Sequence, residues 1–249
     1  MGKDGTIVML QETKPKSRPL SSNLRSLKDE LDGELFYDDT LRRLYATDAS
    51  VYREMPLAVA FPKTETDLTT LIRFARRNRV GLIPRTAGTS LAGQVVGRGI
   101  VVDVSRHFTE ILEWNAEERW VRVQPGVVRD ELNRFLEPHG LMFGPETSTS
   151  NRAMMGGMVG NNSCGSNSVV CGNTRQHLIE VKGYLSDGSP AAFGPLDPEA
   201  FARRCETGDD LETALYRHIR DTLASEDHRR EILERFPKPS IHRRNTGYA

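Results

Sequence analysis

The most informative segment of this 249-residue chain is Pro84-Arg85-Thr86-Ala87-Gly88-Thr89-Ser90-Leu91-Ala92-Gly93-Gln94. It lies between two apolar segments, residues 80–84 and 100–104, which we expect to form strands. Glycine adopts backbone conformations closed to other residues, and its missing side chain lets a ligand approach the main chain. Exposed backbone N–H groups in such a loop form a concave anion site, to which Thr86, Thr89 and Ser90 add hydroxyl donors. The stretch therefore predicts a pyrophosphate-binding loop.

Two better-known phosphate-binding loops do not fit this stretch. A Walker A loop requires Gly-Lys followed by Ser or Thr, and the G-x-G-x-x-G fingerprint requires a long helix that begins directly after it. An ordinary turn without a ligand is the simpler alternative, and the stretch alone does not exclude it. A second glycine-rich segment favours the ligand-binding interpretation.

This second segment is unusually rich in Gly, Ser and Asn. It consists of Gly144-Pro145-Glu146-Thr147-Ser148-Thr149-Ser150 and then Met154-Met155-Gly156-Gly157-Met158-Val159-Gly160-Asn161-Asn162-Ser163-Cys164-Gly165-Ser166. The helix-like spacing of its apolar residues predicts a short buried helix followed by a polar loop. Asn161, Asn162 and Ser163 both donate and accept hydrogen bonds, which suits a heteroaromatic ring and phosphates. The alternative, a flexible low-complexity loop, would not carry four large apolar residues.

Both segments, in this order and at this separation, resemble the FAD-binding domain of the vanillyl-alcohol oxidase / p-cresol methylhydroxylase family. The likeness is greatest to the D-lactate, glycolate and D-2-hydroxyglutarate dehydrogenase-like branch, and it covers roughly residues 52–193. Residues 84–90 resemble the pyrophosphate loop of the family and residues 156–165 its second flavin-contacting loop. The other markers, in order, are residues 102–105, 123–127, 165–170 and 186–188, the last two resembling large bacterial enzymes that also carry iron–sulfur domains.

The resemblance implies an α+β fold of two small subdomains with flanking helices, and FAD lying between them. It implies a pyrophosphate site at Arg85, Thr86, Gly88, Thr89 and Ser90, and an isoalloxazine and ribityl site at Pro145, Gly157, Asn161, Ser163 and Gly165. The full set of cofactor-binding positions adds Pro84, Ala87, Gly93, Gln94, Glu146, Thr147, Gly156, Asn162, Ser166 and Gly172.

The sequence departs from the family pattern at two positions. Cys171 precedes Gly172, where the family usually has a tyrosine beside the flavin. We interpret this cysteine as a small apolar replacement rather than a covalent attachment point. Members that attach FAD through a histidine carry that residue in the first loop, where this chain has Thr89. The resemblance therefore implies non-covalent, dissociable FAD.

The resemblance also implies a reaction. A D-2-hydroxy acid, of the D-lactate, glycolate or D-2-hydroxyglutarate type, would be oxidised to the 2-oxo acid by hydride transfer to flavin N5. The electron acceptor would be an iron–sulfur domain, a quinone or a cytochrome. We assign no catalytic acid or base, because none of the six histidines sits in a ligand or triad constellation. Two alternatives stay open: a catalytically silent FAD-binding fragment, and a nucleotide- or phosphosugar-binding protein that uses no flavin.

Composition narrows the class of protein. Lys and Arg total 34, as do Asp and Glu, so the net charge gives no reason to expect nucleic-acid or anionic-membrane binding. No apolar run approaches the roughly 20 residues of a membrane span. Three cysteines without a close pair fit a reducing compartment, and we expect a cytoplasmic protein. They form neither a zinc motif nor an iron–sulfur motif, so any such cluster would belong to a part beyond this chain.

The chain is expected to have three parts: a disordered arm over residues 1–22, a helical lead-in over 23–51 and the FAD-binding domain over 52–249. Relatives continue into further elements and a substrate cap, so we expect a C-terminally incomplete domain, the fragment of a longer flavoenzyme. Arg243 and Arg244 would line a carboxylate site or, more simply, belong to a surface connection.

Local patterns predict the individual elements. Thr64-Glu65-Thr66-Asp67 resembles a capping box that begins a helix, which Gly81 would end. His139 is interpreted as a cation near the C-terminus of a second helix, over residues 128–136. A further helix is expected over residues 24–35, interrupted near its end by Asp32-Gly33. Helices are also expected over residues 209–223 and 226–236, and hairpins over residues 111–123 and 178–193.

Overall fold

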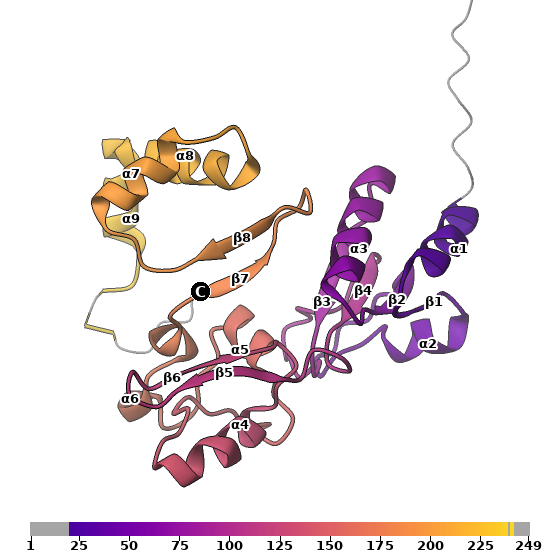
Figure 1. Ribbon diagram of the computed structural model, residues 1–249, viewed down its shortest axis with the longest axis horizontal. Helices are drawn as coiled ribbons and strands as arrows, with labels where there is room; N and C mark the ends of the chain where they lie inside the picture. Colours follow the sequence, from indigo (N-terminus) through magenta and orange to yellow (C-terminus); the bar gives the residue numbers. More distant parts are fainter. Residues whose placement is uncertain (1–19, 239, 242–249) are drawn as a thin grey trace, which may run out of the picture.

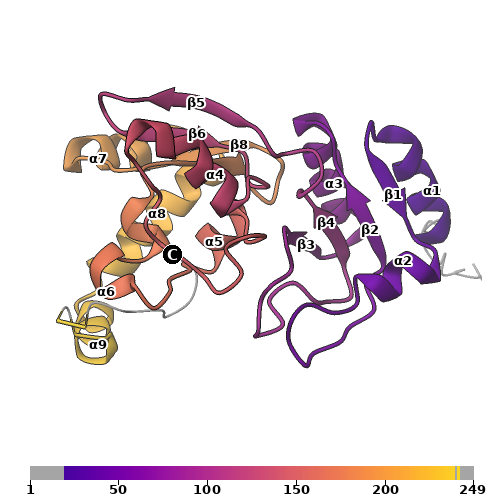
Figure 2. The ribbon, with the colours of Figure 1, turned by 90° about the horizontal axis from the view of Figure 1, so that it is seen from below.

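The computed structural model describes residues 20–238 and 240–241, which form two lobes (Figures 1 and 2). The first lobe contains α1 (Leu20–Glu30), β1 (Glu34–Phe36), α2 (Asp39–Leu44), β2 (Ala58–Phe61), α3 (Glu65–Asn78), β3 (Leu82–Arg85) and β4 (Ile100–Asp103). The second contains β5 (Ile111–Asn115), β6 (Trp120–Val123), α4 (Arg129–Leu136), α5 (Met155–Gly160), α6 (Ser168–Cys171), β7 (Val181–Tyr184), β8 (Pro190–Phe193), α7 (Pro198–Glu206), α8 (Leu211–Ala224) and α9 (Glu226–Arg235). Helices and strands are thus mixed in an α+β arrangement.

The first lobe is built on a four-stranded sheet in the order β1-β2-β4-β3. β1 is antiparallel to β2, whereas β2, β4 and β3 run parallel. The two central strands, β2 and β4, are buried at every residue, as expected for parallel strands covered on both faces. The predicted strands on both sides of the first loop are therefore confirmed, and the loop joins the end of β3 to the start of β4.

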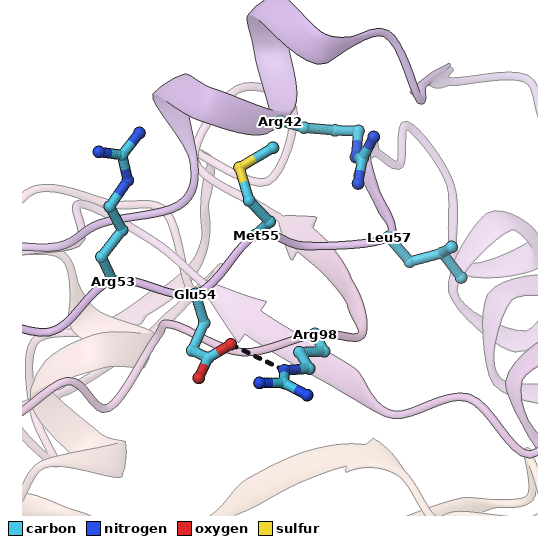
Figure 3. Close-up of a pocket in the computed structure, with 6 residues that line it drawn as sticks. All are labelled: Arg42, Arg53, Glu54, Met55, Leu57 and Arg98. Carbon is cyan, nitrogen blue, oxygen red and sulfur yellow. Dashed lines mark hydrogen bonds and ion pairs between the residues drawn. The ribbon is translucent and has the colours of Figure 1, made fainter.

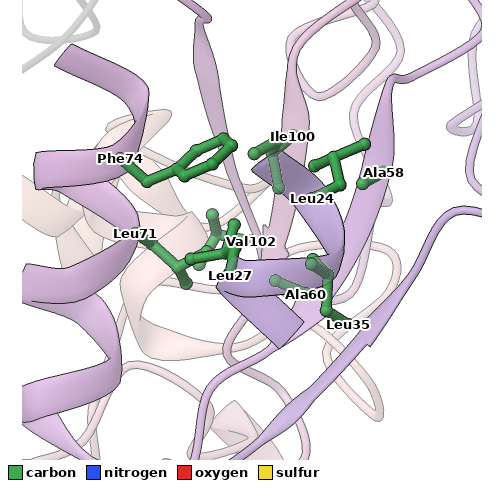
Figure 4. Packing of buried hydrophobic residues seen from close by; sticks show 9 residues of the cluster. All are labelled: Leu24, Leu27, Leu35, Ala58, Ala60, Leu71, Phe74, Ile100 and Val102. Atoms are coloured by element: carbon green, nitrogen blue, oxygen red, sulfur yellow. The ribbon is translucent and has the colours of Figure 1, made fainter. Parts of the chain in front are cut away.

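Helices α1 and α3 cover one face of this sheet and create the main core (Figure 4). The core consists of Leu24, Leu27, Leu35, Ala58, Ala60, Leu71, Phe74, Ile100 and Val102. The opposite face carries Val59, Phe61 and Val101, packed against side chains of α2 and β1. Alternate residues of the central strands thus serve two separate clusters, which fixes the register of the sheet.

Helix α3 begins as the sequence predicts and ends differently. Thr64 accepts from the N–H of Asp67, and Asp67 in turn accepts from the N–H of Thr64, which completes the capping box. The buried Asp67 carboxylate also accepts hydrogen bonds from three more backbone N–H groups, those of Asp32, Gly33 and Lys63. The expectation that Gly81 ends the helix is wrong, because the left-handed residue at the C-terminus is Arg79, with φ of 54°.

The N-terminal region differs from the expected helix over residues 24–35. The helix starts at Leu20 and stops at Glu30, and Leu35 lies in β1. Gly33 explains the break, since a Cβ atom there would lie 2.2 Å from the Phe61 carbonyl oxygen. Helix α1 includes residues 20–22 of the proposed arm, and the rest of that arm lies outside the described residues.

The core of the second lobe lies between the β5–β6 hairpin and helices α4 and α5. Its buried residues are Val127, Leu132, Leu136, Ala153, Met155 and Met158. Both hairpins predicted from the sequence are present, as are the helices α4, α8 and α9. His139 follows α4, and its ring packs on that of Trp114, with the ring centroids 5.0 Å apart.

Helices α7, α8 and α9 follow the second hairpin as a helical extension (Figure 1). Their side chains leave much apolar surface exposed, most of all Leu233 at 82% and Ile219 at 51%. The sequence analysis missed α2 and α7. Arg243 and Arg244 lie outside the described residues. None of the helices in the described part of the chain has the length and apolar character that crossing a membrane requires.

Candidate functional site

The two glycine-rich loops meet where the two lobes face one another. The side-chain amide of Gln94 donates to Oδ1 of Asn161 over 2.9 Å, although the residues are 67 positions apart. Thr86 also lies close to Gly157, because a Cβ atom on that glycine would be 2.6 Å from Thr86 Oγ1. The structure therefore brings together the two segments that the sequence singled out.

Arg85 anchors the first loop to the segment around Tyr45 and Thr47. Its guanidinium donates to the Thr47 carbonyl over 2.8 Å and stacks on the Tyr45 ring, 4.9 Å from the centroid. Gly88 has φ of +64°, and a Cβ atom there would lie 2.4 Å from the Arg85 guanidinium. The loop thus needs glycine at position 88 because of Arg85 as well as any ligand.

A buried polar pair lies next to Arg85. The Tyr45 hydroxyl donates to the Asp103 carboxylate over 2.6 Å, and burial together with this bond raises the pKa of Tyr45 well above its usual value. The other Asp103 oxygen accepts from the N–H of Ser105. Sequence analysis missed Tyr45 and Asp103, since their contact spans 58 positions and leaves no local signal.

Inside the first loop, Ser90 closes a tight turn. Its hydroxyl donates to Gln94 Oε1 over 2.7 Å and accepts from the N–H of Ala92. Gly93, with φ of +70°, lies against the ring of Tyr52. Among the described residues, the Thr86 and Thr89 hydroxyls have no protein partner, so these two groups are available as donors in the loop.

In the second loop the structure divides the polar residues into two groups. Asn161 is exposed, whereas Asn162 and Ser163 are buried. The Asn162 side chain accepts from the N–H of Arg175, and the Ser163 carbonyl accepts from both the N–H and the hydroxyl of Thr174. Asn162 and Ser163 therefore shape the loop, while Asn161 is its exposed polar side chain, whose amide donates to the Ser163 hydroxyl over 3.1 Å.

Glu146 connects the start of the second segment to its end. Its carboxylate accepts from the Ser166 hydroxyl over 2.8 Å and from the N–H of Asn167 over 3.3 Å. The Ser166 hydroxyl is the main cause that lowers the pKa of Glu146 below its usual 4.5. Gly165 packs against Glu146, where a Cβ atom would lie 2.4 Å from its Cγ.

The remaining predicted positions belong to the same two segments of the chain. Pro145 is buried, and Thr147 lies with its hydroxyl 3.3 Å from that of Thr149. Gly156 packs on Pro125, and Gly172, with φ of +72°, packs on Gln176. Pro84 and Ala87 belong to the end of β3 and the first turn of the loop.

The donor set fits a dinucleotide cofactor. Gly157 brings main chain close to Thr86, where the loops meet, and among the described residues the Thr86 and Thr89 hydroxyls are free to donate. Ser168 Oγ, just after the second loop, is buried without a partner in the described part of the chain. Asp48 Oδ2 and Asn173 Oδ1 are buried without a partner in the same way, so none of these atoms marks a ligand by itself.

A separate surface pocket of about 520 Å³ lies beside the starts of β2 and β4 (Figure 3). Its lining residues are Arg42, Arg53, Glu54, Met55, Leu57 and Arg98. Arg98 pairs with Glu54 over 2.9 Å. None of the predicted cofactor-binding residues lines it. Within residues 20–238 and 240–241, His, Cys, Asp and Glu form no cluster that would hold a metal ion.

Comparison with known proteins identifies the family. Residues 56–193 match the family described as FAD binding domain, and the chain belongs to this family. It is 41% identical over 222 residues to a D-2-hydroxyglutarate dehydrogenase of Pseudomonas putida, covering 87% of this chain and 21% of the relative. It is 32% identical to the glycolate oxidase subunit GlcD of Escherichia coli, covering 73% of this chain and 37% of that subunit.

The fold agrees with that of a solved structure. The structure of p-cresol methylhydroxylase matches with a TM-score of 0.61 at 12% identity, over 70% of this chain and 35% of that one. The predicted α+β fold of this type is thereby confirmed, as is the predicted family. The chain spans about a fifth of the length of the D-2-hydroxyglutarate dehydrogenase that it matches.

Proposed function

We propose that this chain binds FAD non-covalently between the loop of residues 84–94 and the segment of residues 144–172. The observation that carries the proposal is the hydrogen bond from Gln94 to Asn161, which joins the two loops directly. The membership in the FAD binding domain family supports it independently. Thr86 and Thr89 are the donors for the pyrophosphate, and Arg85 supplies positive charge while it supports the loop.

We further propose that the chain is the cofactor-holding part of a cytoplasmic D-2-hydroxy-acid dehydrogenase. The identity of 41% to a D-2-hydroxyglutarate dehydrogenase favours that acid over D-lactate or glycolate. FAD, when bound, supplies the hydride acceptor that converts the 2-hydroxy acid to the 2-oxo acid. The residues of this chain bind and orient the cofactor, and the electron acceptor would be an iron–sulfur domain, a quinone or a cytochrome.

The first experiment is a visible absorption spectrum of the purified chain, before and after addition of FAD and desalting. Retained flavin bands that disappear after acid precipitation of the protein support non-covalent binding. A folded chain that stays colourless would contradict the proposal and favour a nucleotide or phosphosugar ligand. Circular dichroism establishes whether the colourless chain is folded.

The second experiment tests the proposed chemistry. The FAD-loaded chain is incubated without oxygen with D-2-hydroxyglutarate, and with the L enantiomer as control. Bleaching of the flavin by the D enantiomer alone supports a substrate site that this chain helps to form. Retained FAD without bleaching favours a catalytically silent FAD-binding fragment.

A further inference from the structure

The β7–β8 hairpin connects the second lobe to helix α3 of the first lobe. The Tyr184 hydroxyl, at the end of β7, donates to the carboxylate of Glu65, the first residue of α3. At the turn of the hairpin, a Cβ atom on Gly188 would lie 3.7 Å from the side chain of Arg73. Figures 1 and 2 both show the tip of the hairpin beside α3.

Electrostatic interactions favour the contact between the β7–β8 hairpin and α3. The hydrogen bond to Glu65 raises the pKa of Tyr184 to about 12, so the hydroxyl keeps its proton throughout the neutral range. The Ser189 hydroxyl is the main cause that lowers the pKa of Asp187, and the nearby Arg76 lowers it further. A carboxylate at the hairpin turn therefore faces the basic side of α3, which the sequence marks with Arg73 and Arg76.

The hairpin does not belong to either core. Within the part of the chain that the structure describes, β7 and β8 pair only with each other, and most of their residues are exposed or half-buried. An isolated two-stranded hairpin is marginally stable, so the contacts of its ends determine where it lies. A pocket of about 400 Å³ behind it is lined by residues of α3, the hairpin, α7 and α8, among them Glu65, Tyr184, Arg204 and Glu212.

We propose that the β7–β8 hairpin is a strap between the lobes and that Tyr184 is a positioning residue for FAD. Its hydrogen bond to Glu65 sets the separation of the lobes, and thereby the distance between the first loop and Asn161. The proposal rests on the proposed function, since it deepens the account of how the two loops are held for the cofactor. It predicts that a change far from the loops alters FAD affinity.

The test compares Tyr184→Phe with Tyr216→Phe in the full chain. Tyr216 is the matched control, because its ring packs on Phe193 and Phe201 at the base of the hairpin, away from α3. We expect Tyr184→Phe to weaken FAD binding about fivefold by fluorescence titration, the effect of one partly exposed hydrogen bond to a charged group. The control should bind as the wild type does. Glu65→Gln keeps an acceptor for the Tyr184 hydroxyl, so it should lose much less FAD affinity than Glu65→Ala.

Hydrogen–deuterium exchange of the chain without FAD tests the strap independently of the cofactor. In Tyr184→Phe, residues 84–94 and 181–193 should exchange faster, with the core strands β2 and β4 unchanged. Unchanged exchange of residues 84–94 would overturn the strap, whether or not the wild type binds FAD. Equal losses of FAD affinity in Tyr184→Phe and Tyr216→Phe would also overturn the strap, because they would indicate a general effect on stability. If Tyr184→Phe shows this exchange pattern but the wild type binds no FAD, the proposed function alone is contradicted.

Discussion

Gln94 and Asn161 form the hydrogen bond that joins the two glycine-rich loops, at 2.9 Å between the amide nitrogen and the amide oxygen. Gln94→Ala removes this bond, together with the bond that Gln94 Oε1 accepts from the Ser90 hydroxyl, and leaves the core of each lobe intact. We expect the Kd for FAD to rise about fivefold, because an exposed hydrogen bond contributes roughly 1 kcal/mol. Gln124→Ala is the control, since its amide forms a similar exposed bond to the N–H of Glu110. Equal effects of both substitutions would contradict a specific role for the Gln94 bond.

Gly88 offers a second test of the first loop, with Gly140 as a matched control. Both glycines have positive φ, 64° and 67°, but a Cβ atom at Gly140 meets nothing within 4 Å. Alanine at either position costs about 1–2 kcal/mol of stability in the left-handed conformation. Only Gly88→Ala should also weaken FAD binding, by about tenfold or more, because its Cβ displaces Arg85 and blocks the approach of a ligand. Thermal unfolding and FAD titration separate the two effects.

The contact between Gly157 and Thr86 predicts a rescue by a second substitution. A Cβ atom on Gly157 would lie 2.6 Å from Thr86 Oγ1, so Gly157→Ala should separate the loops. Thr86→Ala removes the obstructing oxygen. Alanine is about 1 kcal/mol better than glycine within a helix, and the double variant should therefore be at least as stable as Thr86→Ala alone. A double-mutant cycle of unfolding free energies measures the coupling, and additive effects would contradict the close contact.

Asp67 is expected to be the most sensitive polar residue of the first lobe. Its carboxylate is buried and accepts backbone N–H groups from the turn before β1 and from the start of α3. Asp67→Ala leaves these donors unpaired, at a cost of about 3 kcal/mol in unfolding free energy. Urea denaturation measures this cost. Asp29→Ala, in the exposed part of α1, is the control and should change stability by less than about 0.5 kcal/mol.

Patterns that depend on neighbouring residues predicted much of the fold. The capping box at Thr64 and the two hairpins were recognisable because turn and cap chemistry lies within a few residues. The interruption at Asp32-Gly33 was also recognisable, but its cause was not, since it arises from the approach of Phe61, which is distant in sequence. Short helices such as α2 have too few turns to show a clear apolar period.

The candidate site shows the same limit. The sequence identified both loops by composition, but it treated Asn161, Asn162 and Ser163 as equivalent. The structure separates them, because Asn162 and Ser163 use their polar groups on Arg175 and Thr174. Which polar residue faces outward depends on tertiary contacts that no local pattern encodes.

The acid dependence of FAD binding should identify the contribution of Glu146. Its lowered pKa means that the folded chain favours the carboxylate, so the stabilisation from its contacts with Ser166 and Asn167 is fully present above the usual pKa of 4.5 and is lost as the pH falls through the lowered pKa. Glu146→Gln has no charge at any pH, and at pH 7 it should bind FAD more weakly by a factor below about three, as for an exposed charge. This difference should vanish as the pH falls through the lowered pKa, because the wild type then also becomes neutral.

FAD titrations from pH 7 to pH 3.5 measure the ratio of the two Kd values. Glu117→Gln, in the β5–β6 turn, should give a ratio near one throughout, and a wild-type to Glu146→Gln ratio that stays constant with pH would contradict the role of the Glu146 charge.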